Sequence, residues 1–108
     1  MIGRVNFNEA IFSNVSAGAG CFEFGNLLIQ WGQVSITPTA NTPTSAAVLF
    51  SKSYAYTPSV HVTPETTVPG STVKGWGAAN ESTTGFNAYV YRSNATTTVL
   101  NWIAVGQK

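Results

Sequence analysis

The sequence predicts an all-β domain, with its strands arranged as an antiparallel sandwich or a small barrel. Only 8% of the 108 residues are charged, and Thr, Ser, Asn and Gly take their place, which favours strands and turns over helix interiors. About six or seven short apolar runs are separated by Gly, Pro and Asn turn signals. A chain of this length suits a single domain, and no segment has the periodicity of a helix.

The first twenty residues differ from the rest and are predicted to form an extended lead-in followed by a flexible joint. Residues 1–13 carry scattered apolar side chains between Asn and Glu, and the small residues 16–20 interrupt them. The lead-in is either packed on a neighbouring subunit or a frayed terminus. We therefore assign residues 1–20 to the lead-in and joint, and residues 21–108 to the β-domain.

The next elements are predicted as strands in chain order. Residues 21–24 and 27–36 flank Gly25-Asn26, and two apolar runs around a two-residue turn are typical of a β-hairpin. Polar segments and turns follow at residues 37–44, 51–58, 64–71 and 93–95. The strands between these segments are residues 45–50, 59–63, 72–79 and 86–92.

The second strand of the hairpin changes its apolar phase. Its apolar residues occupy odd positions up to Trp31 and even positions from Val34 onward, with Gly32 at the change. A β-bulge shifts the alternation of a strand in this way, and Gly is common at bulges. We therefore predict a bulge at Gly32.

The final strand, residues 98–105, is apolar on both faces. Leu100, Trp102 and Ala104 follow one phase, whereas Ile103 and Val105 follow the other. Because an antiparallel strand that faces water on one side should alternate apolar and polar residues, the second face must meet something else. Another copy of the same chain is the simplest partner, so we expect an obligate oligomer.

Composition excludes several functional classes. The net charge is +1 and the five basic residues are scattered, which argues against nucleic-acid binding. No window is apolar over the length that a membrane span requires. Cys21 is the single cysteine, so an intrachain disulfide is impossible. The N-terminal residues lack a signal-peptide pattern, and we expect synthesis in a cytoplasm.

The sequence offers little for catalysis, and we expect neither an enzyme nor a bound cofactor. There is no Asp, and His61 is the sole histidine, so a Ser-His-Asp triad is impossible. His61 lies on the polar phase of its strand, where it is either a solvent-facing residue or a binding residue. A metal site would need several ligands to converge, for example three copies of His61 on a threefold axis.

The polar-tipped aromatic and amide residues instead favour sugar recognition. Sugar C–H faces pack on aromatic planes, and sugar hydroxyls need fixed donors and acceptors. The alternatives are that the aromatic residues fill the core or a subunit interface, and that Arg92 and Asn94 belong to a solvated turn. The residues that suit a sugar site are Tyr54, Tyr56, His61, Trp76, Asn80, Glu81, Tyr89, Tyr91, Arg92 and Asn94.

An ordered set of short segments resembles the C-terminal receptor-binding domains of bacteriophage tail fibres, which are themselves similar to H-type lectins. The resemblance covers residues 21–106. It implies an antiparallel β-sandwich of about six strands, assembled as a parallel homotrimer, that binds cell-surface glycans. The segments are residues 28–32 (LIQWG), 48–50 (VLF), 56–60 (YTPSV), 84–86 (TGF) and 102–106 (WIAVG).

The resemblance also implies a location for the site. In the lectins, sugar is contacted by the turn between the last two strands and a neighbouring loop, and here that turn is residues 91–95. This chain lacks the Asp and the His of the lectin pattern, so the sugar preference of the lectins does not carry over. The predicted ligand-binding residues are His61, Trp76, Asn80, Tyr91, Arg92 and Asn94.

The predicted function is therefore attachment of a phage or prophage tail fibre to its host. The domain would be synthesised in the bacterial cytoplasm and form the homotrimeric tip of the fibre on the virion, joined to an upstream fibre shaft. Its partner would be a bacterial surface polysaccharide or a teichoic acid, with no nucleic acid and no membrane insertion. The alternatives are a structural trimerisation or capping domain of a fibre and a free-standing soluble lectin similar to the H type.

Overall fold

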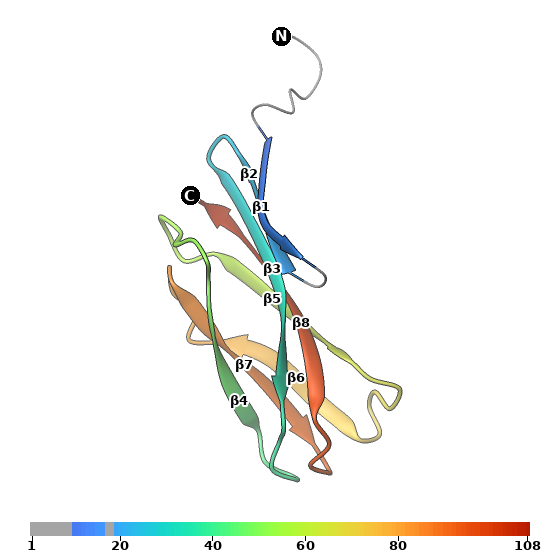
Figure 1. Ribbon diagram of the computed structural model, residues 1–108. Coiled ribbons are helices and arrows are strands. Elements are labelled where there is room, and N and C mark those ends of the chain that lie inside the picture. The colour runs from blue at the N-terminus through green and yellow to red at the C-terminus, as the bar shows by residue number, and fades with distance from the viewer. Residues whose placement is uncertain (1–9, 17–18) are drawn as a thin grey trace.

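The computed structural model describes residues 10–16 and 19–108, and this part of the chain contains eight strands in two antiparallel sheets (Figure 1). The predicted all-β class is confirmed. Side chains are described from residue 19 onward. The strands are β1 (Ala10–Ser16), β2 (Ala19–Phe24), β3 (Leu27–Ile36), β4 (Thr44–Leu49), β5 (Ser59–Glu65), β6 (Val73–Ala79), β7 (Gly85–Arg92) and β8 (Thr98–Gln107).

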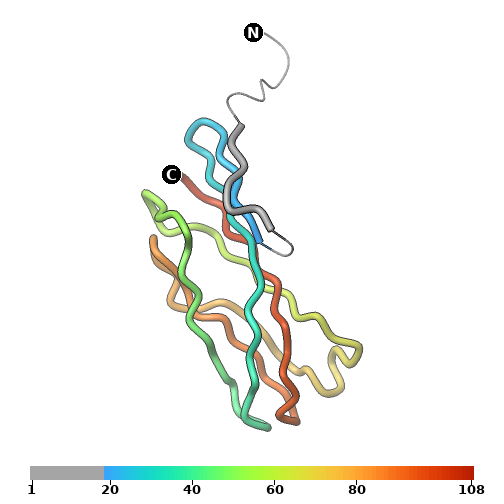
Figure 2. The backbone as a smooth tube through the Cα atoms, in the orientation of Figure 1, coloured from blue at the N-terminus to red at the C-terminus, as the bar shows by residue number. Residues whose placement is uncertain are grey.

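The two sheets form a sandwich, and they differ in their number of strands. One sheet has the order β1-β2-β3-β8-β5, and the other has the order β4-β7-β6. The three-stranded sheet covers one end of the larger sheet (Figures 1 and 2). β1 and β2 lie toward the other end (Figure 1). At the covered end, the β3–β4 and β7–β8 loops lie side by side. The Thr37 and Thr97 hydroxyls hydrogen bond there at 2.7 Å.

Each strand predicted from residue 21 onward is present within one or two residues of its expected bounds. Gly25 adopts φ +59° in the predicted hairpin turn, a conformation that glycine adopts without strain. β5 continues through Pro64 to Glu65, which is tolerated because β5 is an edge strand.

The structure describes only part of the N-terminal segment that was predicted to form the lead-in and joint. Residues 10–16 of the expected lead-in form β1, which pairs with β2 in the same sheet. The expected start of the β-domain at residue 21 falls within β2. Residues 1–9 of the lead-in and residues 17–18 of the joint lie outside the described residues.

The bulge predicted at Gly32 is wrong. β3 pairs with β8 over its whole length without a register shift. Its even positions face the core throughout, as shown by the burial of Leu28, Gln30 and Ile36, whereas Trp31 lies on the opposite face. The apolar phase changes because β3, like β8, is apolar on both sides along part of its length.

The core lies between the two sheets and is closed at one end by aromatic rings. The ring of Phe50 lies 5.1 Å from that of Tyr54 and 5.8 Å from those of Phe86 and Trp102, measured between centroids. The Tyr54 hydroxyl donates to the carbonyl of Ala104 at 3.0 Å. Burial raises the pKa of this phenol.

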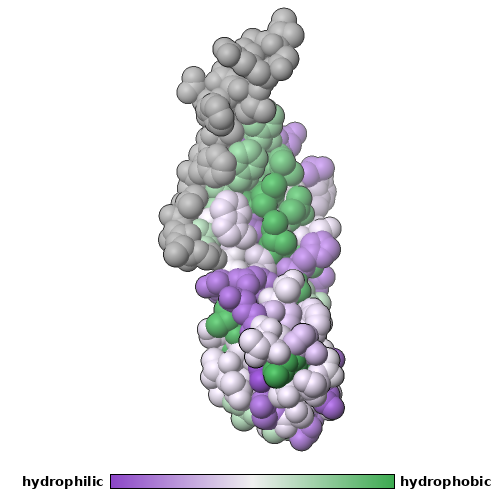
Figure 3. All heavy atoms as spheres, turned by 90° about the vertical axis from the view of Figure 1, so that its right-hand side faces the viewer, coloured by the Kyte–Doolittle hydropathy of each residue, from purple (hydrophilic) through white to green (hydrophobic). Residues whose placement is uncertain are grey.

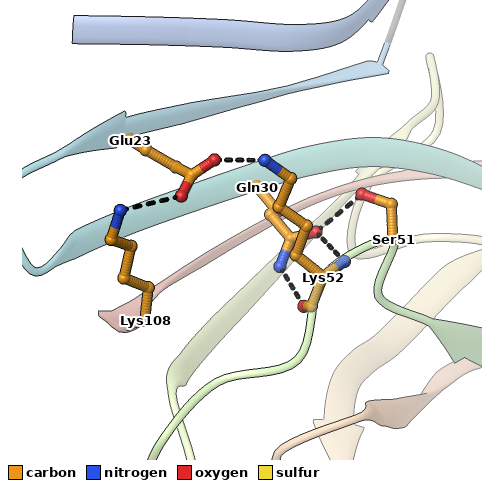
Figure 4. A network of polar contacts seen from close by, with 5 residues as sticks. All are labelled: Glu23, Gln30, Ser51, Lys52 and Lys108. Carbon is orange, nitrogen blue, oxygen red and sulfur yellow. Dashed lines mark hydrogen bonds and ion pairs between the residues drawn. The ribbon is translucent and has the colours of Figure 1, made fainter. Parts of the chain in front are cut away.

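A polar network attaches the connection after β4 to β3 (Figure 4). The side chain of Gln30, 1% exposed, accepts hydrogen bonds from the Ser51 hydroxyl at 2.9 Å and the Lys52 amide at 3.1 Å. It also donates to the Lys52 carbonyl at 2.8 Å. Glu23 forms ion pairs with Lys52 and Lys108, and the hydrogen bond from Lys52 lowers the pKa of its carboxyl.

Candidate functional site

The outer face of the five-stranded sheet is apolar, as the final strand predicted. On β8, Ile103 and Val105 face away from the core, and Ile103 is 41% exposed. Figure 3 shows a hydrophobic patch in the upper half of the molecule, whereas the lower half of that side is mostly neutral or hydrophilic. Strand register aligns the residues of this surface, which we call the apolar face: Phe22, Ile29, Trp31, Ile103 and Val105.

The outer face of the three-stranded sheet is different and is polar-tipped and aromatic. Tyr89 and Tyr91 project from the central strand β7, together with Asn87. Their cross-strand neighbours are small, because Tyr91 lies opposite Gly75, and Tyr89 lies between Gly77 and Ser45. The two tyrosines therefore form a ridge with open space beside it.

This surface, which we call the tyrosine face, contains a shallow groove of about 300 Å³. Trp76 lies at its border on the edge strand β6 and is 46% exposed. The register pairs Trp76 with the buried Val90, so its phase is opposite to that of the tyrosine rings. Such rings offer planes on which a sugar ring can stack, with phenol groups that hydrogen bond to hydroxyls. The groove is lined by Pro43, Gly75, Trp76, Gly77, Ala78, Tyr89, Val90 and Tyr91.

A second hollow lies at the covered end of the sandwich, between the β5–β6 and β7–β8 loops. It has a volume of about 440 Å³. Arg92 contributes to its wall and is only 6% exposed, so this residue is not part of a solvated turn. We call this hollow the arginine recess, and its lining consists of Glu65, Thr66, Thr67, Val68, Arg92, Thr96 and Thr97.

Asn94 orients the guanidinium of Arg92. The Arg92 Nε–H donates to Asn94 Oδ1 at 2.8 Å, and Nη1–H donates to Thr98 Oγ1 at 2.8 Å. Asn94 Oδ1 also accepts from the Thr96 amide at 3.4 Å. Arg92 and Asn94 thus contact each other, with Asn94 acting on the arginine side chain.

The six predicted site residues do not meet at one place. Tyr91 projects from the tyrosine face, and Trp76 borders its groove from the opposite strand phase. Arg92 lines the arginine recess, and Asn94 is hydrogen bonded to it. Asn80 follows β6 with φ 54°, at the end of that strand remote from Arg92.

His61 lies on the other sheet, where β5 pairs it with Ile103 beside the apolar face. Its binding role, like that of the other predicted site residues, remains a prediction.

The structure adds several residues to these surfaces. Tyr89, which the sequence marked only as suited to sugar, is the neighbour of Tyr91 on the same face. The available signal was that Tyr89 precedes Tyr91 by two residues, a spacing that puts both side chains on the same face of a strand. Glu65, Thr66 and Thr67 were missed because nothing local connects the β5–β6 loop with Arg92.

Other kinds of site find no support in the described part of the chain. Within residues 10–16 and 19–108, no group of three His, Cys, Asp or Glu side chains is placed to hold a metal ion. In the same residues, no helix is long and apolar enough to cross a membrane.

Comparison with known proteins shows the fold. No family model and no curated protein matches the chain. The fold is similar to that of the N-truncated R1-type pyocin tail fibre, with a TM-score of 0.69 and 19% identity over 90% of this chain and 84% of that chain. It is also similar to a C-terminal part of the Pseudomonas aeruginosa R1 pyocin fibre, with a TM-score of 0.70 and 19% identity over 90% of this chain and 28% of that chain.

The corresponding part of the P. aeruginosa R2 pyocin fibre gives a TM-score of 0.66 at 24% identity, over 90% of this chain and 25% of that chain. This chain therefore spans only about a quarter of the longer fibre pieces. At these identities the likeness establishes a shared β-fold, in agreement with the tail-fibre fold that the sequence suggested. The resemblance to H-type lectins stays a prediction.

Proposed function

We propose that this domain is the non-enzymatic, homotrimeric receptor-binding tip of a phage or prophage tail fibre. It attaches to bacterial surface glycans, and an upstream fibre shaft carries it on the virion. The fold shared with pyocin tail fibres over 90% of the chain supports the fibre context. The observation that carries the binding role is the tyrosine face, where Tyr89 and Tyr91 stand above small neighbours.

The chemistry of the two outer faces assigns them different roles in this proposal. The apolar face carries aliphatic and indole groups that lower the free energy by leaving water, which suits contact between protomers. The tyrosine face combines ring planes with hydroxyl groups, which suits a ligand that is itself partly polar. The apolar face also favours the second candidate, a purely structural trimerisation or capping domain, because that role needs no ligand.

Alanine substitution on the tyrosine face tests the proposal. We expect Tyr89→Ala and Tyr91→Ala each to weaken attachment to host cells, and to the glycans that the wild type binds on an array, by about tenfold or more, because a stacking ring is lost. Tyr56→Ala is the matched control, since Tyr56 is 68% exposed and lies outside this face. Attachment of both variants at the wild-type level would place the site elsewhere. A wild type that binds neither cells nor glycans would favour the capping role.

A further inference from the structure

The arginine recess contains a buried cation without a counter-ion. The guanidinium of Arg92 has five N–H donors, and its hydrogen bonds go to the neutral oxygens of Asn94 and Thr98. Among the described residues, the ion pairs are those of Glu23 with Lys52 and Lys108, and none involves Arg92. Arg92 is only 6% exposed, and a buried charge without an ion pair carries a large desolvation cost. An anion from outside the chain would offset that cost.

The surroundings of this cation form a site that a ligand can enter. The recess holds about 440 Å³ and is lined by four threonines, Thr66, Thr67, Thr96 and Thr97. Threonine hydroxyls both donate and accept hydrogen bonds, as an oxyanion and its neighbouring sugar hydroxyls require. The loops that carry these threonines lie at the end of the sandwich (Figure 1).

One acid, Glu65, belongs to the lining. Its Oε2 accepts a hydrogen bond from Gln33 Nε2 at 3.2 Å, and it forms no ion pair with Arg92. Its negative charge opposes the entry of a second anion, so it reduces the affinity of the recess without filling it. Removing the charge of Glu65 should therefore strengthen anion binding, whereas removing the charge of Arg92 should weaken it.

We propose that the arginine recess binds the oxyanion of an acidic glycan, either a uronate carboxylate or a phosphate, through Arg92. The planar guanidinium fork matches both groups bidentately. Asn94 is a positioning residue, because its bond to Nε fixes the direction of the fork. That the oxyanion belongs to a glycan rests on the function proposed above.

Nuclear magnetic resonance of the full chain labelled with nitrogen-15 tests this assignment. Three probes are compared: methyl glucuronide, glycerol phosphate and, as the neutral control, methyl glucoside. The chain has two arginines, Arg4 and Arg92, so the Nε–Hε signal of Arg4 serves as an internal reference. We expect at least one acidic probe to shift the Arg92 signal and the amides of residues 66–68 saturably, with no response to methyl glucoside. Response to one acidic probe alone identifies carboxylate or phosphate as the ligand group, and silence toward both overturns the proposal.

Two substitutions with opposite expected effects complete the test. Arg92→Gln should weaken binding of the active probe by about tenfold or more, because a charge-assisted bidentate contact is lost. Glu65→Gln should strengthen it by about threefold, because a repelling charge is removed while an acceptor for Gln33 is kept. Lys74→Gln, at an exposed position of β6, is the control for a general loss of positive charge and should leave the affinity unchanged. If Arg92→Gln does not fold, an unchanged or lower affinity of Glu65→Gln still overturns the proposal.

The outcomes separate this inference from the proposed function. A wild type that attaches to host glycans while Arg92 ignores both acidic probes refutes the inference and leaves the function standing. Saturable binding at Arg92, combined with wild-type attachment of the Tyr89→Ala and Tyr91→Ala variants, supports the recess and refutes the role of the tyrosine face. Loss of the oligomer in Arg92→Gln without any probe response assigns the counter-ion to a neighbouring copy of the chain and overturns the inference.

Discussion

At the residue scale, two glycines are explained by the tryptophans opposite them. A Cβ atom on Gly20 would lie 2.4 Å from the ring of Trp31, and one on Gly32 would lie 2.9 Å from the ring of Trp102. Gly32 is therefore needed for its lack of a side chain, since it forms no bulge. The apolar pattern singled out this position but predicted a bulge there, because the ring that requires a glycine comes from a strand seventy residues away in the chain.

Substitution of Gly32 should reveal this steric requirement. We expect Gly32→Ala to lower the free energy of unfolding by about 1–3 kcal/mol, because the new methyl group overlaps the Trp102 ring. Gly77→Ala is the matched control, because a Cβ there meets nothing within 4 Å. It should be neutral or raise stability by roughly 0.5–1 kcal/mol, as expected for replacing a strand glycine. Urea unfolding measures both, and equal effects would mean that Trp102 does not restrict position 32.

At the scale of the strands, most of the fold follows from local signals. The turn residues Gly25-Asn26 and the alternation within residues 59–63 act over a few neighbours, so the strands they define were predictable. The face of β3 that is buried in the core was not predictable, because alternation does not tell which of two apolar faces points inward. Gln30 shows the same limit, since it is polar in the sequence and 1% exposed in the structure.

The predicted site residues are dispersed for the same reason, because local sequence signals do not tell which strand ends lie together. Asn80 directly follows β6 and Arg92 is the last residue of β7, so the two looked equivalent in the sequence as residues at strand ends. In the sheet, β6 and β7 run antiparallel, with Val73 paired to Arg92 and Ala79 paired to Asn87. Asn80 and Arg92 therefore lie at opposite ends of the same strand pair, and which loops meet at each end depends on the topology of the whole sandwich.

Gln30 ties β3 to the connection between β4 and β5, and its replacement should loosen that connection. We expect Gln30→Met to lower the free energy of unfolding by about 2 kcal/mol, because the amide and carbonyl of Lys52 lose their partners. The Lys52 amide should also exchange its hydrogen faster. Gln33→Met, at an exposed position of the same strand, should change the exchange of Lys52 little. Unaltered protection of Lys52 in the Gln30 variant would show that the connection is held by other contacts.

At the scale of the whole molecule, the two outer faces have contrasting chemistry. The five-stranded sheet exposes Ile103 together with the rest of the apolar face, and its polar residues, such as Gln33 and Asn101, gather farther along the strands. The three-stranded sheet exposes Tyr89 and Tyr91 among small residues. A monomer would leave both in water, and the apolar face would gain most from being covered.

Measuring the oligomeric state tests whether the apolar face is covered by other copies of the chain. We expect light scattering to give about three times the chain mass of 11.4 kDa at micromolar concentration. Ile103→Asp should dissociate the oligomer or prevent folding, because an unpaired charge would be buried at the contact. Thr63→Asp adds the same charge on an exposed residue of β5 and should leave the mass unchanged. A monomeric wild type would contradict the assembly, whereas equal dissociation by both variants would mean that charge anywhere on this sheet, rather than burial of Ile103, controls association.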